Sequence, residues 1–262
     1  MTNSPKSATD PQRSEPTPKE SSRVQTAYSR PKQSPLVRFG KRIRDPVNAW
    51  FSSQSQIATS PLLSDAELPE LAGMAQNWRV IRQELEVLLA GEEEIPHFGK
   101  ISPDHRRIAN GPQWKSFFFE GYGFKSAQNC AKCPQTAKLL DAIPGLVVAF
   151  FSIMDGDTHV PRHRGLTKAW LNCHLPLIVP TNPGRCEMQV GDQIVNWREG
   201  EWLVFDETYP HEVWNETGQQ RVVLMLQVRR PMRWPGRALA RTIFEMIRRT
   251  SFVQDVRRAI GA

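Results

Sequence analysis

The feature that most constrains the fold is a series of short apolar segments, separated by turn residues, between positions 146 and 228. Their lengths and their content of β-branched and aromatic residues are typical of β-strands, and Gly191-Asp192 between two of them is a hairpin turn signal. Seven or so short strands in succession predict a mainly β protein, for which the jelly roll, or double-stranded β-helix, is a known architecture. The expected strands cover residues 146–154, 169–179, 186–190, 193–197, 201–205, 212–215 and 221–228.

Flanking N- and C-terminal helices are expected around this core. Residues 65–90 carry apolar side chains at the helical period, with Ser64 as N-cap and Glu67 as its capping-box partner. A shorter helix is expected over residues 134–142. Residues 237–249 place apolar side chains on one side and arginines around them, which predicts an amphipathic helix.

The charge is concentrated at the two ends of the chain. Residues 1–60 hold 10 Lys and Arg against 4 Asp and Glu, and residues 229–262 hold 9 Arg against 2 acidic residues. Since the whole chain carries +7, residues 61–228 carry −6. The folded domain is therefore not expected to bind nucleic acid. The basic ends favour peripheral contact with an anionic membrane instead.

The composition divides the chain into four segments. Residues 1–35, rich in Ser, Pro, Thr, Lys and Gln, are expected to be a disordered tail. Residues 36–60 are a basic linker or an interfacial segment, in which Pro46 is expected to interrupt any helix. Residues 61–228 form the main domain, with a helical N-terminal part and the jelly-roll core. Residues 229–262 form a basic helical extension, whose arginines are expected to be a solvated face.

Neither a signal peptide nor a membrane-spanning segment is expected, because no apolar stretch is long enough. We therefore expect a cytoplasmic protein, with the inner face of a membrane as the alternative location. Four cysteines are too few for a disulfide scaffold in a chain of this size. Cys130 and Cys133 are expected to be reduced structural thiols, since a closed zinc site needs four ligands and Cys173 and Cys186 lie in or beside other strands.

Two histidines, His163 and His211, lie near the ends of expected strands and are the best candidates for metal ligands. Imidazole suits Fe(II), and a site with open positions leaves room for a chelating cosubstrate. Arg221, at the head of the last strand, can hold a carboxylate of 2-oxoglutarate through two parallel hydrogen bonds. The usual iron triad has a carboxylate two residues after the first histidine, and Gly165 stands there instead. The third position on the iron is then left to water, to a halide or to an oxygen of a nearby acid. The nearby acids are better explained as turn and cap residues: Asp155, Asp157, Asp206 and Glu207.

The segment from about residue 114 to residue 233 resembles the aspartyl/asparaginyl β-hydroxylase family of Fe(II)/2-oxoglutarate dioxygenases. That family is known for a two-histidine site, which agrees with a glycine at position 165. The matching pieces are Phe151-Ser152-Ile153-Met154, Gly156-Asp157-Thr158-His159-Val160, His163-Arg164-Gly165, Cys173-His174-Leu175-Pro176-Leu177, Trp197-Arg198-Glu199-Gly200, Phe205-Asp206-Glu207, His211-Glu212-Val213-Trp214-Asn215 and Arg221.

The resemblance implies a role for each of these side chains. By it, His163 and His211 bind iron, Ser152 and Arg221 bind the distal carboxylate of 2-oxoglutarate, and His174 contacts its other end. Trp114 matches a tryptophan on the substrate side of the family's pocket, with a buried structural tryptophan as the alternative.

One departure from the family concerns the substrate. Many members have an arginine two residues before the position of His174, where it can hold a carboxylate, and this chain has Asn172 there. The family includes hydroxylases of Asp and Asn side chains and a bacterial branch that hydroxylates an acyl chain of lipid A. Asn172 and the basic ends favour a lipid acyl chain, and an Asp/Asn side chain in a peptide remains the second substrate class.

The predicted function is a dioxygenase that hydroxylates an unactivated C–H bond and releases succinate and CO2 from 2-oxoglutarate. Two alternatives belong to other classes of protein. A non-catalytic jelly-roll binding module is expected to lose a metal ligand or Arg221, and the chain keeps them. A cupin-like metalloprotein that uses no 2-oxoglutarate has no need for Arg221 together with Ser152.

Overall fold

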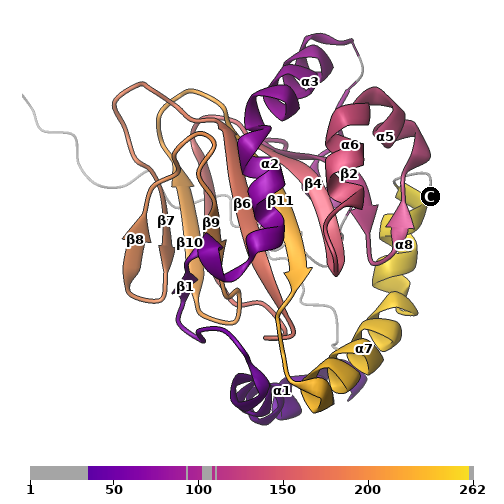
Figure 1. Cartoon of the computed structure of the whole chain (residues 1–262). Coiled ribbons are helices and arrows are strands. Elements are labelled where there is room, and N and C mark those ends of the chain that lie inside the picture. Colours follow the sequence, from indigo (N-terminus) through magenta and orange to yellow (C-terminus); the bar gives the residue numbers. More distant parts are fainter. Residues whose placement is uncertain (1–34, 93, 102–107, 110, 260–262) are drawn as a thin grey trace, which may run out of the picture. The chain divides into compact units, whose positions relative to one another are not determined.

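The computed structural model describes residues 35–92, 94–101, 108–109 and 111–259 (Figure 1). The predicted disordered tail lies outside these residues, apart from Pro35, so its disorder stays a prediction. The described residues from Gly40 onward belong to one compact unit.

Two antiparallel sheets form the core of that unit (Figure 1). The larger sheet has the order β1-β9-β6-β11-β4-β2-β3 and the smaller one has the order β5-β10-β7-β8. Apolar side chains from both sheets, such as Val160, Met188, Val213 and Val223, pack in one buried cluster between them. This is the jelly roll that the sequence predicts. The strands are β1 (Leu62–Leu63), β2 (Trp114–Gly121), β3 (Phe124–Lys125), β4 (Leu146–Met154), β5 (Thr158–His163), β6 (Trp170–Ile178), β7 (Cys186–Val190), β8 (Gln193–Val195), β9 (Leu203–Phe205), β10 (His211–Asn215) and β11 (Arg221–Arg229).

All seven expected strands are present, with small shifts at their ends. The strand β5 was not expected, because Pro161 and three basic or imidazole side chains hide its alternating pattern of burial. Pro161 is tolerated because β5 is an edge strand, where one side of the backbone needs no hydrogen-bond donor. His211 starts β10 and does not lie in the preceding turn as expected.

Helices cover one face of the larger sheet (Figure 1). Ile81 and Leu85 of α3 pack in the same buried cluster as Leu171, Cys173 and Leu175, which alternate along β6. The opposite face of β6 is left for the space between the sheets. The helices on the covered side are α2 (Ala72–Gln76), α3 (Trp78–Ala90), α5 (Ala127–Lys132) and α6 (Pro134–Asp141).

The continuous helix expected over residues 65–90 is wrong. Two 3-10 turns, Asp65–Glu67 and Pro69–Leu71, precede α2 and α3. Pro69 prevents one long helix because its nitrogen has no proton to donate to the preceding turn. The Ser64 hydroxyl does accept a hydrogen bond from the Ala66 N–H, as an N-cap should.

The predicted capping box is also wrong. The Glu67 carboxylate accepts a hydrogen bond from the backbone N–H of Ala58, at 2.8 Å, and thereby ties the preceding loop to the 3-10 turn.

Pro46 does not interrupt the N-terminal helix, contrary to expectation. It lies inside α1 (Pro35–Gln54), which continues for two more turns beyond it. Phe51 is fully buried and Val47 packs against the same cluster, so tertiary packing compensates for the hydrogen bond that proline removes. This second cluster also receives side chains from α4 (Phe98–Ile101), α7 (Trp234–Arg248) and α8 (Ser251–Ala259).

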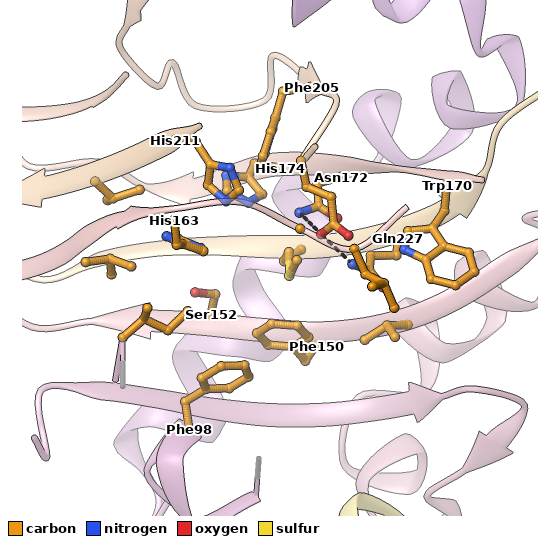
Figure 2. Close-up of a pocket in the computed structure, with 18 of the residues that line it drawn as sticks. Phe98, Phe150, Ser152, His163, Trp170, Asn172, His174, Phe205, His211 and Gln227 are labelled. Atoms are coloured by element: carbon orange, nitrogen blue, oxygen red, sulfur yellow. Dashed lines mark hydrogen bonds between the residues drawn. The ribbon is translucent and has the colours of Figure 1, made fainter. Parts of the chain in front are cut away.

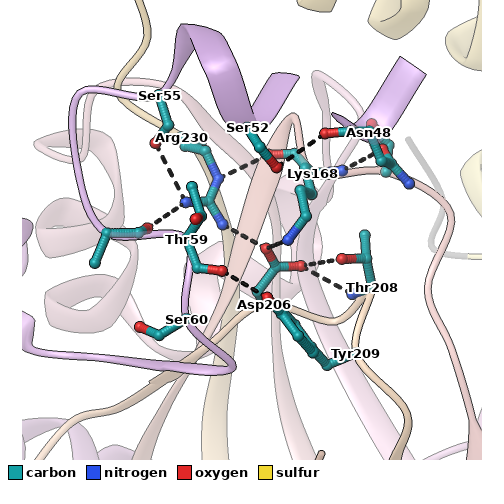
Figure 3. A network of polar contacts seen from close by, with 12 residues as sticks. Asn48, Ser52, Ser55, Thr59, Ser60, Lys168, Asp206, Thr208, Tyr209 and Arg230 are labelled. Carbon is teal, nitrogen blue, oxygen red and sulfur yellow. Dashed lines mark hydrogen bonds and ion pairs between the residues drawn. The ribbon is translucent and has the colours of Figure 1, made fainter. Parts of the chain in front are cut away.

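A buried ionic network joins the N-terminal segment to the jelly roll (Figure 3). Asp206, which has no exposed surface, accepts hydrogen bonds from Lys168 and Arg230, both at 2.6 Å. Arg230 also donates to the Ala58 carbonyl at 2.8 Å, and the Asn48 side chain accepts from the backbone N–H of Lys168 at 2.9 Å. Arg230 therefore does not belong to a solvated face, which corrects the expectation for the arginines after residue 228.

We expect Asp206→Asn to lower the free energy of unfolding by about 3–5 kcal/mol, because it leaves two buried cations without their shared carboxylate. Chemical denaturation at neutral pH measures the change. As a control, Glu201→Gln disrupts an exposed pair with Arg198 at 3.8 Å and should cost less than about 1 kcal/mol. Equal losses for the two variants would contradict the structural role of Asp206.

Candidate active site

Strand alternation directs one set of side chains into a cavity of about 430 Å³ (Figure 2). This volume is in the range of small-molecule sites, roughly 300–1,000 Å³. On β6 the inward residues include Asn172 and His174, and on β11 they include Arg221 and Gln227. All seven site residues expected from the sequence line this single cavity: Trp114, Ser152, His163, Asn172, His174, His211 and Arg221.

His163 and His211 face each other from neighbouring strands of the smaller sheet. They are Cα partners in the pairing of β5 with β10, and their ring centroids lie 4.1 Å apart. Nδ1 of His163 lies 2.8 Å from the Pro161 carbonyl, and Nδ1 of His211 lies 3.0 Å from the Tyr209 carbonyl. Donation from Nδ1–H to a carbonyl fixes the tautomer whose lone pair is on Nε2, as is usual for a metal-binding histidine.

The electrostatic environment keeps the second of these rings neutral. Burial, followed by the neighbouring His163, lowers the pKa of His211 to about 4. A neutral imidazole is the form that binds a metal ion. Among the residues that the structure describes, no group of three or more His, Cys, Asp or Glu could hold a metal, so no third ligand of these types joins the pair there.

Arg221 is a buried cation without a carboxylate partner. Its side chain is 2 % exposed, and its Nε and Nη1 atoms have no hydrogen-bond acceptor among the described residues. The guanidinium lies 4.4 Å from the centre of the Trp197 ring, and burial lowers the pKa of Arg221 to about 10. Because an unpaired buried charge costs several kcal/mol, about 3–5, Arg221 is suited to bind an anion that the described part of the chain does not supply.

Ser152 is held close to this cation by a side chain from the next strand. The indole N–H of Trp114 donates to the Ser152 hydroxyl oxygen at 3.0 Å. The serine proton is thereby left to donate to a ligand, since a hydroxyl has one donor and two acceptor positions. Trp114 thus has a local structural contact that accounts for its burial, whatever its relation to the substrate.

His174 is a neutral donor in the middle of the cavity. Its Nδ1 accepts a hydrogen bond from the Trp197 indole N–H at 3.3 Å, which leaves the ring proton on Nε2. Burial, followed by the charges of Arg221 and His211, lowers the pKa of His174 well below its ordinary value. Trp197 therefore supports both His174 and Arg221, a role that the sequence did not reveal.

One of the nearby acids that the sequence analysis explained as turn and cap residues lines the cavity. Glu207 accepts hydrogen bonds from the side-chain amides of Asn172 at 3.1 Å and Gln227 at 3.0 Å (Figure 2). Burial raises the pKa of Glu207 to about 7. The sequence had one signal for this group, which is Gln227 as a polar residue inside the apolar run 221–228.

Gly165 explains how Glu207 reaches this place. A Cβ atom at position 165 would overlap the Glu207 side chain, so a carboxylate ligand two residues after His163 does not fit there. The backbone N–H of Gly165 also donates to the Glu207 carbonyl at 2.6 Å. The glycine therefore makes room for a carboxyl group from another loop.

The comparisons with known proteins agree with this geometry. The sequence profile described as "Aspartyl/Asparaginyl beta-hydroxylase" matches residues 75–231. The chain is 34% identical to the ornithine lipid ester-linked acyl 2-hydroxylase of Rhizobium tropici, over 97% of this chain and 91% of that protein.

The chain belongs to the aspartyl/asparaginyl beta-hydroxylase family.

A second family member and a solved structure of low similarity match less of the chain. The human aspartyl/asparaginyl beta-hydroxylase is 27% identical over 60% of this chain, which spans 21% of that protein. A solved prolyl hydroxylase from Trichoplax adhaerens, in complex with a hypoxia inducible factor peptide, aligns with a TM-score of 0.40 at 14% identity, over 79% of this chain and 97% of that one. As a member of the family, this chain is a hydroxylating enzyme of the dioxygenase type.

Glu207 should make the stability of this family member depend on pH. Its folded-state pKa of about 7 lies above the ordinary value of 4.5, so the folded chain keeps a proton that the unfolded chain has released. The free energy of unfolding should therefore fall as pH rises from 4.5 towards 7, and Glu207→Gln should remove this part of the slope. Denaturation curves of both proteins at several pH values measure it. The exposed Glu216→Gln is the control, and parallel curves for wild type and Glu207→Gln would contradict the assignment.

Proposed function

We propose that the protein is an Fe(II)- and 2-oxoglutarate-dependent hydroxylase of an ester-linked lipid acyl chain. In this proposal His163 and His211 hold the iron, and Arg221 with Ser152 holds the distal carboxylate of 2-oxoglutarate. His174 contacts the other end of the cosubstrate.

The observation that carries the proposal is the unpaired Arg221 in the same cavity as the two histidines. A bidentate guanidinium matches a carboxylate in geometry and in charge. Ser152 lies two residues from Met154, the Cα partner of Arg221 across β4 and β11. Both donors therefore reach one carboxylate from adjacent strands, which agrees with a dicarboxylate cosubstrate and argues against a cupin that uses none.

The protein's own contribution to the reaction is to bind and orient. The carbonyls of Pro161 and Tyr209 lie behind the Nδ1 atoms of His163 and His211 and hold both rings in place. Trp197 keeps the His174 proton on Nε2, where it can donate to an oxygen of the cosubstrate. Bound iron would supply the activation of O2, coupled to conversion of 2-oxoglutarate to succinate and CO2, that C–H hydroxylation requires.

A lipid acyl chain suits the remainder of the cavity. Beyond the histidines its walls are mainly apolar, and two of the side chains come from the C-terminal helices α7 and α8. The relative that matches nearly the whole chain is named for an ester-linked acyl 2-hydroxylation. Asn172 in place of an arginine argues against the carboxylate of an Asp side chain at this place. The apolar lining consists of Phe98, Phe118, Val148, Phe150, Trp170, Met225, Ile247 and Val256.

Anaerobic addition of Fe(II) and 2-oxoglutarate should produce a visible metal-to-ligand charge-transfer band, which His163→Ala and His211→Ala each abolish. Arg221→Ala should raise the KM for 2-oxoglutarate by about 10–100-fold with little change in iron content, since it removes charge-assisted hydrogen bonds. Arg198→Ala, which changes an exposed arginine, should leave both readouts unchanged. No band with folded wild-type protein would refute the proposal and favour a binding module.

We also propose that the enzyme works at an anionic membrane surface. Trp50 of α1 and Trp234 and Met246 of α7 are exposed, with Trp234 at 72 %. Large apolar side chains beside basic ones are typical of helices that lie in a membrane interface. No helix among the described residues is long and apolar enough to span a bilayer. The exposed basic residues of α7 and of its two caps are Arg233, Arg237, Arg241 and Arg249.

The double variant Arg237→Ser/Arg241→Ser should weaken binding to vesicles that contain phosphatidylglycerol by roughly 2 kcal/mol, because each basic residue near such a surface contributes about 1 kcal/mol. Co-sedimentation with these vesicles, compared with vesicles of phosphatidylcholine alone, measures the part of the binding that depends on anionic lipid. The matched control Lys138→Ser/Arg198→Ser removes two exposed charges from other elements. Equal loss in both double variants would show that net charge, and not this helix, determines binding.

A further inference from the structure

Glu207 is an acidic group in the cavity wall for which the protein supplies no cation. Within the described part of the chain, no Lys, Arg or His nitrogen lies within ion-pair distance of its carboxylate. The two arginines at the edge of the same cavity, Arg44 and Arg164, lie 3.0 and 3.9 Å from Asp45 instead. The adjacent Lys168 and Arg230 are both paired with Asp206.

The two amides that hold Glu207 leave acceptors without donors. Asn172 and Gln227 direct their NH2 groups to the carboxylate, so their oxygens point away from it. These oxygens, Oδ1 and Oε1, have no hydrogen-bond partner among the described residues, and the two side chains are 4 % and 9 % exposed. A buried carbonyl oxygen without a donor is destabilising, because it has lost its hydrogen bonds to water. Asn172, Glu207 and Gln227 together therefore lack donors for these amide oxygens, and they lack a positive charge beside the carboxylate.

The position of this group places it on the substrate side of the cavity. Asn172 of β6 and Gln227 of β11 are Cα partners. His174 and Met225, two residues away on the same strands, are the next pair that faces the cavity. Arg221 lies on the other side of that pair, six residues from Gln227 along β11, or roughly 20 Å of extended strand. The cosubstrate carboxylate and the Glu207 group therefore have separate places in the cavity, with the histidine region between them.

We propose that Asn172, Glu207 and Gln227 form a subsite for a primary ammonium group of the substrate. An ammonium ion has three donors, no acceptor and a positive charge, which is what the group lacks. The terminal torsions of both amides are broad, so that either oxygen can turn to a cation bound beside the carboxylate. This inference rests on the proposed function for one point only, that the substrate enters this part of the cavity.

Calorimetric titration of the full-length protein with n-octylamine and with 1-octanol at pH 8 tests the subsite. Octylamine is a cation at this pH, and the alcohol has the same chain without the charge. Wild type should bind the amine at least about tenfold more tightly than the alcohol, because a charge-assisted hydrogen bond contributes about 1.5–3 kcal/mol. Glu207→Gln should bring the two dissociation constants within about twofold of each other.

Two further variants distinguish failure of the subsite from failure of the proposed function. Glu216→Gln, in an exposed loop, should retain the preference for the amine. His163→Ala should retain it too, so that loss of the iron and 2-oxoglutarate band is read independently of amine binding. Equal binding of amine and alcohol by wild type would overturn the subsite even if Glu207→Gln fails to fold. A preference that survives in folded Glu207→Gln would also overturn it.

Discussion

The buried carboxylate of Asp206 is the contact on which the candidate site depends (Figure 3). It binds Lys168 before β6 and Arg230 after β11, and Arg230 reaches on to the loop that follows α1. Its other oxygen accepts from the backbone and side chain of Thr208, at 2.9 and 2.6 Å. The turn that carries Glu207 and leads into His211 is thereby anchored to both central strands. Removing either cation would leave the rest of the network with an unbalanced charge in a dry environment.

The cavity shows the opposite arrangement, because two of its charged groups have no partner of opposite sign among the described residues. Arg221 at one end lacks an anion, and Glu207 towards the other end lacks a cation. Protein interiors satisfy buried charge wherever stability is the only requirement, as Asp206 illustrates. Groups that stay unpaired in a cavity are more simply explained as partners for ligands. The apolar side chains between Arg221 and Glu207, and beyond them, then favour a ligand whose polar groups are joined by an apolar chain.

Much of this fold could be predicted from local patterns. Apolar runs between turn residues identified β4, β6 and β11, and the amphipathic pattern identified α7, because these depend on the residues of one segment. The errors share another cause. Pro46 was expected to end a helix that packing of Phe51 sustains, and residues 65–90 form several pieces because Pro69 lies early in them. For the site, His163, His211 and Arg221 stood out by residue type and motif order. Glu207 was considered as an oxygen ligand but explained as a turn or cap residue, since its partners are on other strands.

The sequence by itself determined the type of fold, the identity of the candidate iron and cosubstrate residues and the missing carboxylate at Gly165. These follow from side-chain periodicity, from motif order and from the presence or absence of one chemical group. Only the tertiary structure decided which charges are neutralised. Asp206 and Glu207 are neighbours of the same chemical type, yet one is enclosed by two cations and the other faces a cavity among amides. The physical reason is that pairing depends on distances between atoms up to 175 residues apart in the chain, as for Ser55 and Arg230, which no local pattern encodes.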